Sequence, residues 1–332
     1  MTPVSLVDFG SYLPDFAVGT EYYAGPDAEV SDSLMFRAPK SRRLVSAEET
    51  GAQMAVKAAR PMLDRLAAQG ETGIDMVLTN VALPDRIFTG AGAEIVHRLD
   101  LDPVPEWIID VHNGGCAAFV YLMKIAQHVI ASGGARNALL IAVQNSAGQL
   151  FVQPSVRHKS HAPVPGDGCG VGFLRAGDES PILDVVTYHG VENAEDMNLS
   201  CATRKYWEPG EDEIDVGFTD SKVAKIIARG NKLVPQVAIE LCDRLGTPTR
   251  DIDVLVTNQP NKMFLRNWRE ALQVKPERHL NTYEDYGNLF GAGIPVTLDH
   301  AVRDGSVHKG DLIVMAGFAH AGDFAAAAAV RW

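Results

Sequence analysis

A cysteine preceded by two glycines and followed by an apolar run is the feature with the clearest chemical potential. Cys116 lies in the stretch DVHNGGCAAFVYLMKIAQ. At the first turn of a helix, free backbone N–H groups and the helix dipole favour a thiolate, which predicts a pKa below the usual value of about 8.5. The glycines permit a sharp turn and let an acyl group approach the backbone. The pattern also fits a small cysteine packed in a core, and both interpretations stay open here.

The elements that must position Cys116 are predicted twice along the chain. IDMVLTN at 74–80 and IDVLVTN at 252–258 have the composition of buried parallel strands, and each follows an amphipathic helix. Such patterns recur by chance in α/β proteins, but the matched order of four elements favours a duplication. We therefore expect two similar α/β halves with mostly parallel sheets. The matching elements downstream are helices near 117–132 and 294–304 and strands at 137–144 and 311–319.

Composition and charge exclude several classes of function. The 332 residues are 46% hydrophobic and 22% charged, and the formal net charge is −12. This charge argues against a nucleic-acid or anionic-membrane surface. The four cysteines have no metal-ligand spacing and suggest no disulfide framework, so no metal is expected. Neither a signal peptide nor an apolar run of membrane-spanning length is recognisable, which predicts a cytoplasmic protein.

The segment DVHNGGCAAF resembles the nucleophile motif of the thiolase-fold condensing enzymes, in particular β-ketoacyl-ACP synthase III (KAS III). The resemblance implies a thiolase fold, in which two duplicated α/β halves form a layered αβαβα core. The halves would span 1–175, with the nucleophile, and 176–332, with the asparagine motifs and a closing loop. Further segments resemble the family in the same order along the chain: GSYLPDFAV, RRLVSAEETGAQMAVKAARPML, GDGCGVGF, NQPNKMF, YGNLFGAGIPVTLDHAV and GFAHAGDFAAAAAVRW.

The resemblance also implies roles for individual residues. Cys116 would accept the acyl group, and Asn288 matches the family's catalytic asparagine, whose amide donates to an enolate oxygen. The backbone N–H of Cys116 and one from the 319–322 loop, at Ala321, would form an oxyanion hole.

Asn258 departs from the family, because it stands where a histidine is expected. An amide has no usable pKa and cannot act as a general base. NQPN and GNLFGAG look closer to a branch of KAS III-like acyltransferases in antibiotic biosynthesis. That branch places a histidine where Asn288 stands and an aspartate near Gly293, and this chain has neither. His320 is a further catalytic candidate, because it lies in the closing loop at a position that the family fills with glycine, three residues before Asp323.

Two other residues are candidates for binding substrate. His189 lies in a segment that lines the acyl pocket in relatives. Arg157, with His158, Lys159 and His161, lies on a loop that reaches the CoA entrance in the family, where positive charge suits phosphates or an acidic carrier protein; solvated loop charge is the alternative. The tryptophan that stacks on the CoA adenine has no match in SLMFRAPKSRRL, which favours a carrier-protein donor.

Three functions follow. The first is a KAS III-like acyltransferase of specialised metabolism, which forms acyl-Cys116 from an acyl-CoA or acyl-carrier-protein thioester and passes the acyl group to a small-molecule acceptor. The second is a decarboxylating β-ketoacyl synthase that uses Asn258 and Asn288 as paired amide donors. The third is a degenerate, non-catalytic partner subunit, against which the intact NGGC motif argues. The family implies a homodimer and no permanently bound cofactor.

Overall fold

Two five-stranded sheets form the framework of the molecule. The structure, a computed structural model, describes residues 2–24, 35–112, 114–197 and 199–332. The first sheet has the order β1-β7-β6-β4-β5, with β1 at Val4–Tyr12, β7 at Gly168–Ala176, β6 at Asn137–Gln144, β4 at Met76–Val81 and β5 at Trp107–Asp110. The second has the order β10-β9-β11-β12-β8, with β10 at His279–Leu280, β9 at Val254–Thr257, β11 at Leu312–Ala319, β12 at Phe324–Arg331 and β8 at Ile182–His189.

The two sheets have the same topology. In the first, β4 pairs parallel with β5 and β6, whereas β7 pairs antiparallel with β6 and β1. In the second, β9 pairs parallel with β10 and β11, whereas β12 pairs antiparallel with β11 and β8. The predicted duplication is therefore confirmed. The expectation of mostly parallel sheets is wrong, because each sheet has two parallel and two antiparallel pairs of strands. The division after residue 175 stays a prediction.

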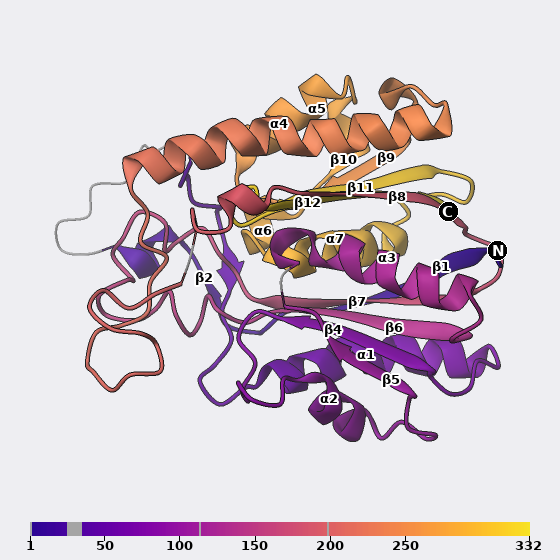
Figure 1. Cartoon of the computed structure of the whole chain (residues 1–332), viewed down its shortest axis with the longest axis horizontal. Coiled ribbons are helices and arrows are strands. Elements are labelled where there is room, and N and C mark those ends of the chain that lie inside the picture. Colours follow the sequence, from indigo (N-terminus) through magenta and orange to yellow (C-terminus); the bar gives the residue numbers. More distant parts are fainter. Residues whose placement is uncertain (1, 25–34, 113, 198) are drawn as a thin grey trace.

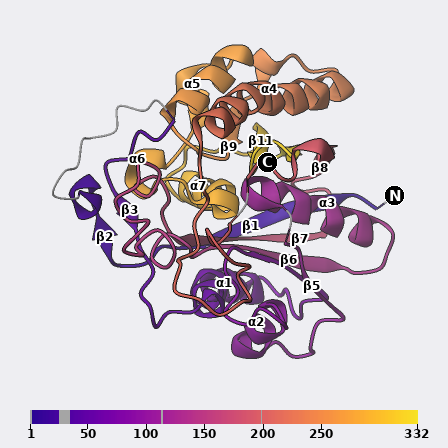
Figure 2. The ribbon, with the colours of Figure 1, turned by 60° about the vertical axis from the view of Figure 1, so that its left-hand side comes forward.

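Helices cover both sheets and fill the space between them, which gives five layers (Figures 1 and 2). One outer layer holds α1 and α2, the middle layer holds α3 and α7, and the other outer layer holds α4 and α5. The helices are α1 (Gly51–Ala68), α2 (Gly92–Leu99), α3 (Ala118–Ala131), α4 (Asp220–Leu245), α5 (Lys262–Ala271), α6 (Tyr283–Tyr286) and α7 (Gly293–Arg303). The shorter pieces are β2 (Ala17–Val18), β3 (Arg42–Arg43), and the 3₁₀ turns η1 (Thr20–Tyr23), η2 (Gly115–Ala117), η3 (Val191–Asn193), η4 (Thr249–Asp251), η5 (Pro276–Arg278) and η6 (Phe290–Ala292).

The middle helices are apolar because sheets pack against more than one of their sides. Phe119 and Met123 of α3 and Ile294 and Leu298 of α7 are fully buried in one cluster with side chains from both sheets. A helix that is apolar on most sides is stable only inside such a core. The N-terminal ends of α3 and α7 are therefore held rigidly at the centre of the molecule.

Expected and observed elements agree closely. The strand predicted at 137–144 is β6, and those predicted at 74–80 and 252–258 are β4 and β9. The helices expected near 117–132 and 294–304 are α3 and α7. The agreement follows because a long stretch of periodically spaced apolar residues identifies a segment as a helix or a strand. The same pattern locates the ends of the segment less precisely.

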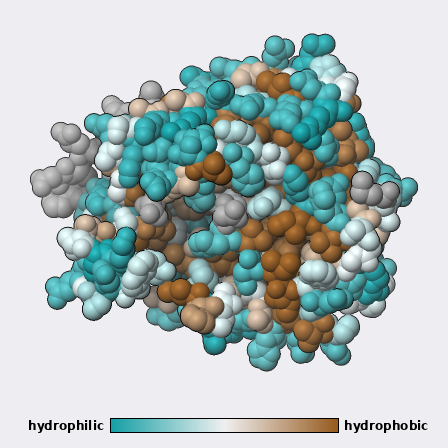
Figure 3. All heavy atoms as spheres, in the orientation of Figure 1, coloured by the Kyte–Doolittle hydropathy of each residue, from teal (hydrophilic) through white to brown (hydrophobic). Residues whose placement is uncertain are grey.

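Large apolar side chains are exposed around the edge strand β5. Ile87 and Phe88 lie in the loop after β4, and Val104 and Trp107 lie just before or within β5. Apolar side chains also gather in the middle of the face on which α3 lies (Figure 3). Among the helices built from the described residues, none is both long and apolar enough to cross a membrane.

Candidate active site

Cys116 lies in the 3₁₀ turn η2, directly before the buried helix α3. Gly115 has a φ of 47°, and a Cβ there would lie 2.8 Å from Cβ of Ala319 and 2.9 Å from Nε2 of His320. Position 115 therefore requires glycine both for its backbone and for its space. Asn113, the first residue of the NGGC motif, lies outside the described residues.

The predicted low pKa of Cys116 is wrong. Burial raises the pKa of the thiol to about 12, the Asn258 side chain lowers it in part, and the negative charge of Asp323 raises it further. The prediction considered the helix terminus and could not include the partial burial of Cys116 against segments distant in sequence, which disfavours the charged form. A raised pKa favours the neutral thiol, and attack of a neutral thiol on a thioester requires that its proton be removed.

Asn258 follows β9 and is fully buried beside Cys116. Its Nδ2 donates to the carbonyl of Phe318 at 3.3 Å, and its Oδ1 accepts from the N–H of the same residue at 3.3 Å. The side chain thereby extends the pairing between β9 and β11 and fixes the end of β11. Sequence analysis identified Asn258 but missed Phe318, because nothing in the sequence indicates this pair of hydrogen bonds.

Asn288 lies just before η6, on the other side of η2, the turn that carries Cys116 and that we call the elbow. Its side-chain Oδ1 accepts from the N–H of Phe290 at 3.0 Å. Among the described residues no hydrogen bond uses its Nδ2. The turn η6 packs directly on η2, since a Cβ on Gly291 would lie 2.8 Å from the carbonyl oxygen of Gly115. Asn288 therefore directly precedes a turn that packs on the one that carries Cys116.

The closing loop joins β11 to β12 and carries His320, Ala321 and Asp323. Nδ1 of His320 lies 3.1 and 3.0 Å from the two carboxylate oxygens of Asp323. Arg229 of α4 donates to the carbonyl of Ala321 at 3.1 Å, and the N–H of Gly190 donates to the carbonyl of Asp323 at 2.8 Å. The loop is therefore held from two neighbouring elements, with Ala321 buried and His320 exposed.

The two candidate binding residues are engaged within the fold. The ring of His189, at the end of β8, lies 4.8 Å from the ring of Phe324 and 6.1 Å from that of Tyr121. Arg157 donates to the carbonyl of Tyr22 from Nε at 2.9 Å, and its guanidinium lies over the Tyr22 ring. Arg157 therefore holds its loop to η1, which the sequence spacing did not reveal.

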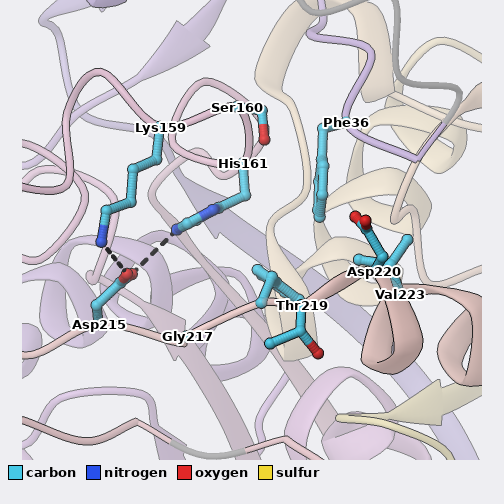
Figure 4. A pocket seen from close by; sticks show the side chains of 10 residues that line it. Phe36, Lys159, Ser160, His161, Asp215, Gly217, Thr219, Asp220 and Val223 are labelled. Carbon is cyan, nitrogen blue, oxygen red and sulfur yellow. Dashed lines mark hydrogen bonds and ion pairs between the residues drawn. The ribbon is translucent and has the colours of Figure 1, made fainter. Parts of the chain in front are cut away.

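A cavity of about 370 Å³ opens where the 159–161 loop faces the segment before α4 (Figure 4). Phe36, Ser160 and Phe218 are among its lining residues. The side chains of Lys159 and His161 point toward Asp215 across it, at 2.6 and 3.0 Å. Burial lowers the pKa of His161. The positive charge expected on this loop is thus balanced by a carboxylate more than 50 residues away in sequence.

The segment that follows the 159–161 loop is hydrogen-bonded to Asn288. The carbonyl of Val164, which follows the 159–161 loop, accepts the N–H of Asn288 at 3.0 Å, and the carbonyl of Asn288 accepts the N–H of Gly166 at 3.1 Å. Phe36 and Val164 belong to one buried cluster with Phe318. No group of three or more potential metal ligands occurs among the residues that the structure describes.

Comparison with known proteins places this geometry in a class. Two family models match: 3-oxoacyl-[acyl-carrier-protein] synthase III over 109–189, and its C-terminal domain over 242–332. The matched segments contain Cys116, Asn258 and Asn288 and together cover just over half of the chain.

Relatives and solved structures agree with the family models. The β-ketoacyl-ACP synthase III of Clostridium perfringens is 26% identical, and that of Coxiella burnetii 28%, each over 96% of this chain and 96% of the relative. FabH from Pseudomonas aeruginosa superposes with a TM-score of 0.83 at 23% identity, covering 99% of this chain and 98% of that one. OleA from Xanthomonas campestris gives 0.80 at 19% identity, covering 100% and 98%.

The protein is therefore a thiolase-fold protein with a cysteine at its central elbow. Within that class, the chain belongs to the 3-oxoacyl-ACP synthase III (KAS III) family.

Proposed function

We propose that the protein is an acyltransferase that forms an acyl-Cys116 intermediate from an acyl-CoA or acyl-carrier-protein thioester and transfers the acyl group to a hydroxyl or amine acceptor. The proposal rests on the position and the hydrogen bonds of Asn258. It occupies the position beside the thiol at which the family resemblance expects histidine, and its amide is bound to the backbone of Phe318 at both ends. Membership of the KAS III family supports a thioester substrate.

The chemistry divides into two acyl transfers. The sulfur of Cys116 attacks the thioester carbonyl, and the backbone N–H groups of Cys116 and Ala321 stabilise the oxyanion. Donor thiol leaves, and the acceptor then attacks the acyl-cysteine through the same tetrahedral geometry. No permanently bound cofactor is required, because the acyl group stays on the enzyme between the two steps.

Acyl transfer fits these residues better than carbon–carbon condensation. Decarboxylation of a malonyl thioester needs donors aimed at the enolate oxygen. Among the described residues no hydrogen bond uses Nδ2 of Asn288, whereas Nδ2 of Asn258 already donates to the carbonyl of Phe318. Transfer of the acyl group to a hydroxyl forms no enolate, so it does not require that both asparagine amides have a donor available.

Decarboxylative condensation is the second candidate. It is supported by the names of the relatives in Clostridium and Coxiella, which are β-ketoacyl-ACP synthases III over nearly their whole length. It requires that the remaining N–H of the Asn258 amide act together with Nδ2 of Asn288. The two candidates share acyl-Cys116 and differ in the second substrate.

The test is a two-stage incubation with intact-mass detection. Acyl-CoA and acyl-carrier-protein donors are screened for a mass adduct, and the adduct is then exposed either to malonyl-carrier protein or to alcohol and amine acceptors. We expect loss of the adduct to an acceptor without carbon dioxide. Release of carbon dioxide with a lengthened acyl chain would establish condensation instead.

We also propose that the enzyme works in the cytoplasm as a homodimer, with β5 as the shared edge. β5 pairs with β4 on one side, and the apolar Val104 and Trp107 are exposed beside it. An exposed strand edge bordered by apolar side chains is a ready surface for a second sheet. Sedimentation of the wild type and of a Trp107→Lys variant tests this, with a shift to monomer expected in the variant only.

A further inference from the structure

We propose that His320, oriented by Asp323, is the general base of this site, and that it removes first the proton of the Cys116 thiol and then the proton of the acceptor. The inference rests on the proposed acyl transfer through Cys116 and adds the group that moves protons there. His320 is the catalytic residue of the pair, and Asp323 is a positioning residue.

The geometry of the pair is that of an oriented histidine. Both oxygens of Asp323 lie within 3.1 Å of Nδ1 of His320, so Nδ1 carries the proton and Nε2 is left as the acceptor. Nε2 lies over Gly115, the residue that precedes the nucleophile, at 2.9 Å from the point where a Cβ would be. A nucleophile, a base and a third group that orients the base recur in this order in unrelated enzymes.

The backbone at His320 indicates that its position is enforced. Its φ is 49°, a left-handed conformation that costs a residue with a side chain and that glycine adopts freely. The loop is held there by Arg229 of α4, which bonds the Ala321 carbonyl, and by Asn193, whose Nδ2 bonds the Gly322 carbonyl at 3.4 Å. Residues kept in such conformations concentrate at functional sites.

The site needs a base, and the other neighbours cannot supply one. The thiol of Cys116 is neutral because burial raises its pKa, and Asp323 raises it further. The amides of Asn258 and Asn288 do not titrate. The charged groups near His320 are Asp323 on its own loop and Arg229 on α4, whose charge is balanced by Asp196. As it takes up a proton, an imidazole that is hydrogen-bonded to Asp323 offsets the carboxylate charge that raises the pKa of the thiol.

The proton path balances in both steps. As Sγ of Cys116 bonds to the acyl carbon, its proton passes to Nε2 of His320, and the departing donor thiolate takes that proton when its C–S bond breaks. In the second step the acceptor hydroxyl gives its proton to Nε2 as its oxygen bonds to the acyl carbon. The C–Sγ bond then breaks, and Cys116 recovers the proton from the imidazolium.

A second histidine–aspartate pair with the same spacing provides a matched control. His308 and Asp311 precede β11, whereas His320 and Asp323 follow it, so the two pairs lie at opposite ends of one strand. Nδ1 of His308 lies 3.6 Å from its aspartate, and its side chain is 75% exposed against 39% for His320. The control pair has the same residues and spacing but lies away from the elbow.

The experiment compares His320→Gly with His308→Gly in the full-length protein. Glycine suits the left-handed backbone at 320, so the variant is expected to fold with an unchanged or higher Tm. The rate of acyl-Cys116 formation should fall by roughly 10²–10⁴-fold in His320→Gly and stay unchanged in His308→Gly. Added imidazole should restore part of the rate in His320→Gly, because a free base can enter the space left by the side chain.

A second readout needs no acyl donor. Alkylation of Cys116 by iodoacetamide, followed by mass spectrometry with Cys116→Ser as the blank, should slow in His320→Gly. Asp323→Asn should slow it less and shift its pH profile, since the imidazole keeps its place but loses its orienting charge. Equal alkylation and acylation rates in wild type and His320→Gly, or a loss that imidazole does not restore, would overturn the role of His320. Failure of every donor to acylate the wild type, with alkylation still dependent on His320, would instead overturn the proposed function alone.

Discussion

In both halves of the molecule a 3₁₀ turn precedes the buried helix, but the two turns carry different functional groups. In the first half η2 precedes α3, and in the second half η6 precedes α7. The first residue of each turn is left-handed, with φ of 47° at Gly115 and 45° at Phe290. The first turn carries the thiol, whereas the second is preceded by the amide of Asn288. In the proposed mechanism, this duplicated turn supplies the nucleophile in the first half and is preceded by a hydrogen-bond donor in the second.

The difference in residue type at these equivalent positions has a local cause. At Gly115 the space for a side chain is taken by Ala319 and His320 from the closing loop. At Phe290 the strained backbone is supported by Asn288, whose Oδ1 accepts its N–H. The comparison shows that the closing loop of the second half is built onto the elbow of the first, so neither half contains the site alone.

The largest effect is expected at the residue that distinguishes the two turns. Cys116→Ala should abolish acyl transfer, with a loss of at least about 10³-fold, because no other group at the elbow is a nucleophile. Intact-mass spectrometry should show no adduct in the variant. Cys242→Ala, which changes a buried cysteine of α4, should keep the adduct; an equal loss there would mean that the modified thiol is not at the elbow.

A smaller effect is expected at the equivalent point of the second half. Asn288→Asp keeps an oxygen acceptor for the N–H of Phe290 but removes the Nδ2 donor. Turnover with a malonyl thioester, the reaction of the second candidate, should fall by roughly 10²-fold, the usual cost of one donor to a developing enolate oxygen, whereas acyl transfer to an alcohol and the Tm should change little. Steady-state kinetics and thermal unfolding of the same preparation separate the two effects. A large fall in Tm with unchanged turnover would make Asn288 purely structural.

Gly115→Ala tests the close approach of the closing loop. The change adds left-handed strain and a clash with Ala319 and His320, so the free energy of unfolding should fall by about 2–4 kcal/mol. Gly133→Ala is the matched control, because its φ is 81° and a Cβ there meets nothing within 4 Å. It should cost about 1–2 kcal/mol, from backbone strain alone. Equal losses in urea unfolding would contradict the packing of the loop on the elbow.

The smallest predicted effect is a pH dependence of stability. The pKa of Cys116 is about 12 in the folded protein, against about 8.5 for an unfolded cysteine. As the pH rises above about 8.5, the unfolded thiol ionises and the folded one does not, so stability is lost. The loss should be about 1 kcal/mol greater in wild type than in Cys116→Ser by about pH 9.5. Urea unfolding of both proteins at pH 7 and at the higher pH measures it; parallel behaviour would indicate a thiol that ionises normally.

Much of the fold was predictable because it depends on long-period patterns. The paired strands at 74–80 and 252–258 and the helices before and after them carry enough apolar residues to identify two layered halves. The position of Cys116 at a turn before a buried helix followed from two glycines and a run of apolar residues.

The electrostatics of the site were not predictable, because they depend on contacts distant in sequence. The pKa of Cys116 was predicted in the wrong direction, since desolvation by residues distant in sequence outweighs the helix terminus. Arg157 and Lys159 were expected to give the loop positive charge for a phosphate or carrier protein or for the solvent. Instead, Arg157 donates to the carbonyl of Tyr22 and Lys159 is paired with Asp215. The pairing of His320 with Asp323 could be suspected from its three-residue spacing, but its approach to Gly115 required the structure.

One measurement tests the central claim that Cys116 carries the acyl group. Wild-type protein is incubated with acyl-carrier-protein and acyl-CoA donors, digested, and mapped by mass spectrometry before and after an alcohol acceptor is added. The account predicts one acyl group on the peptide that contains Cys116 and its loss to the acceptor without release of carbon dioxide. An acyl group on any other residue, or no acyl group with any donor, would contradict it.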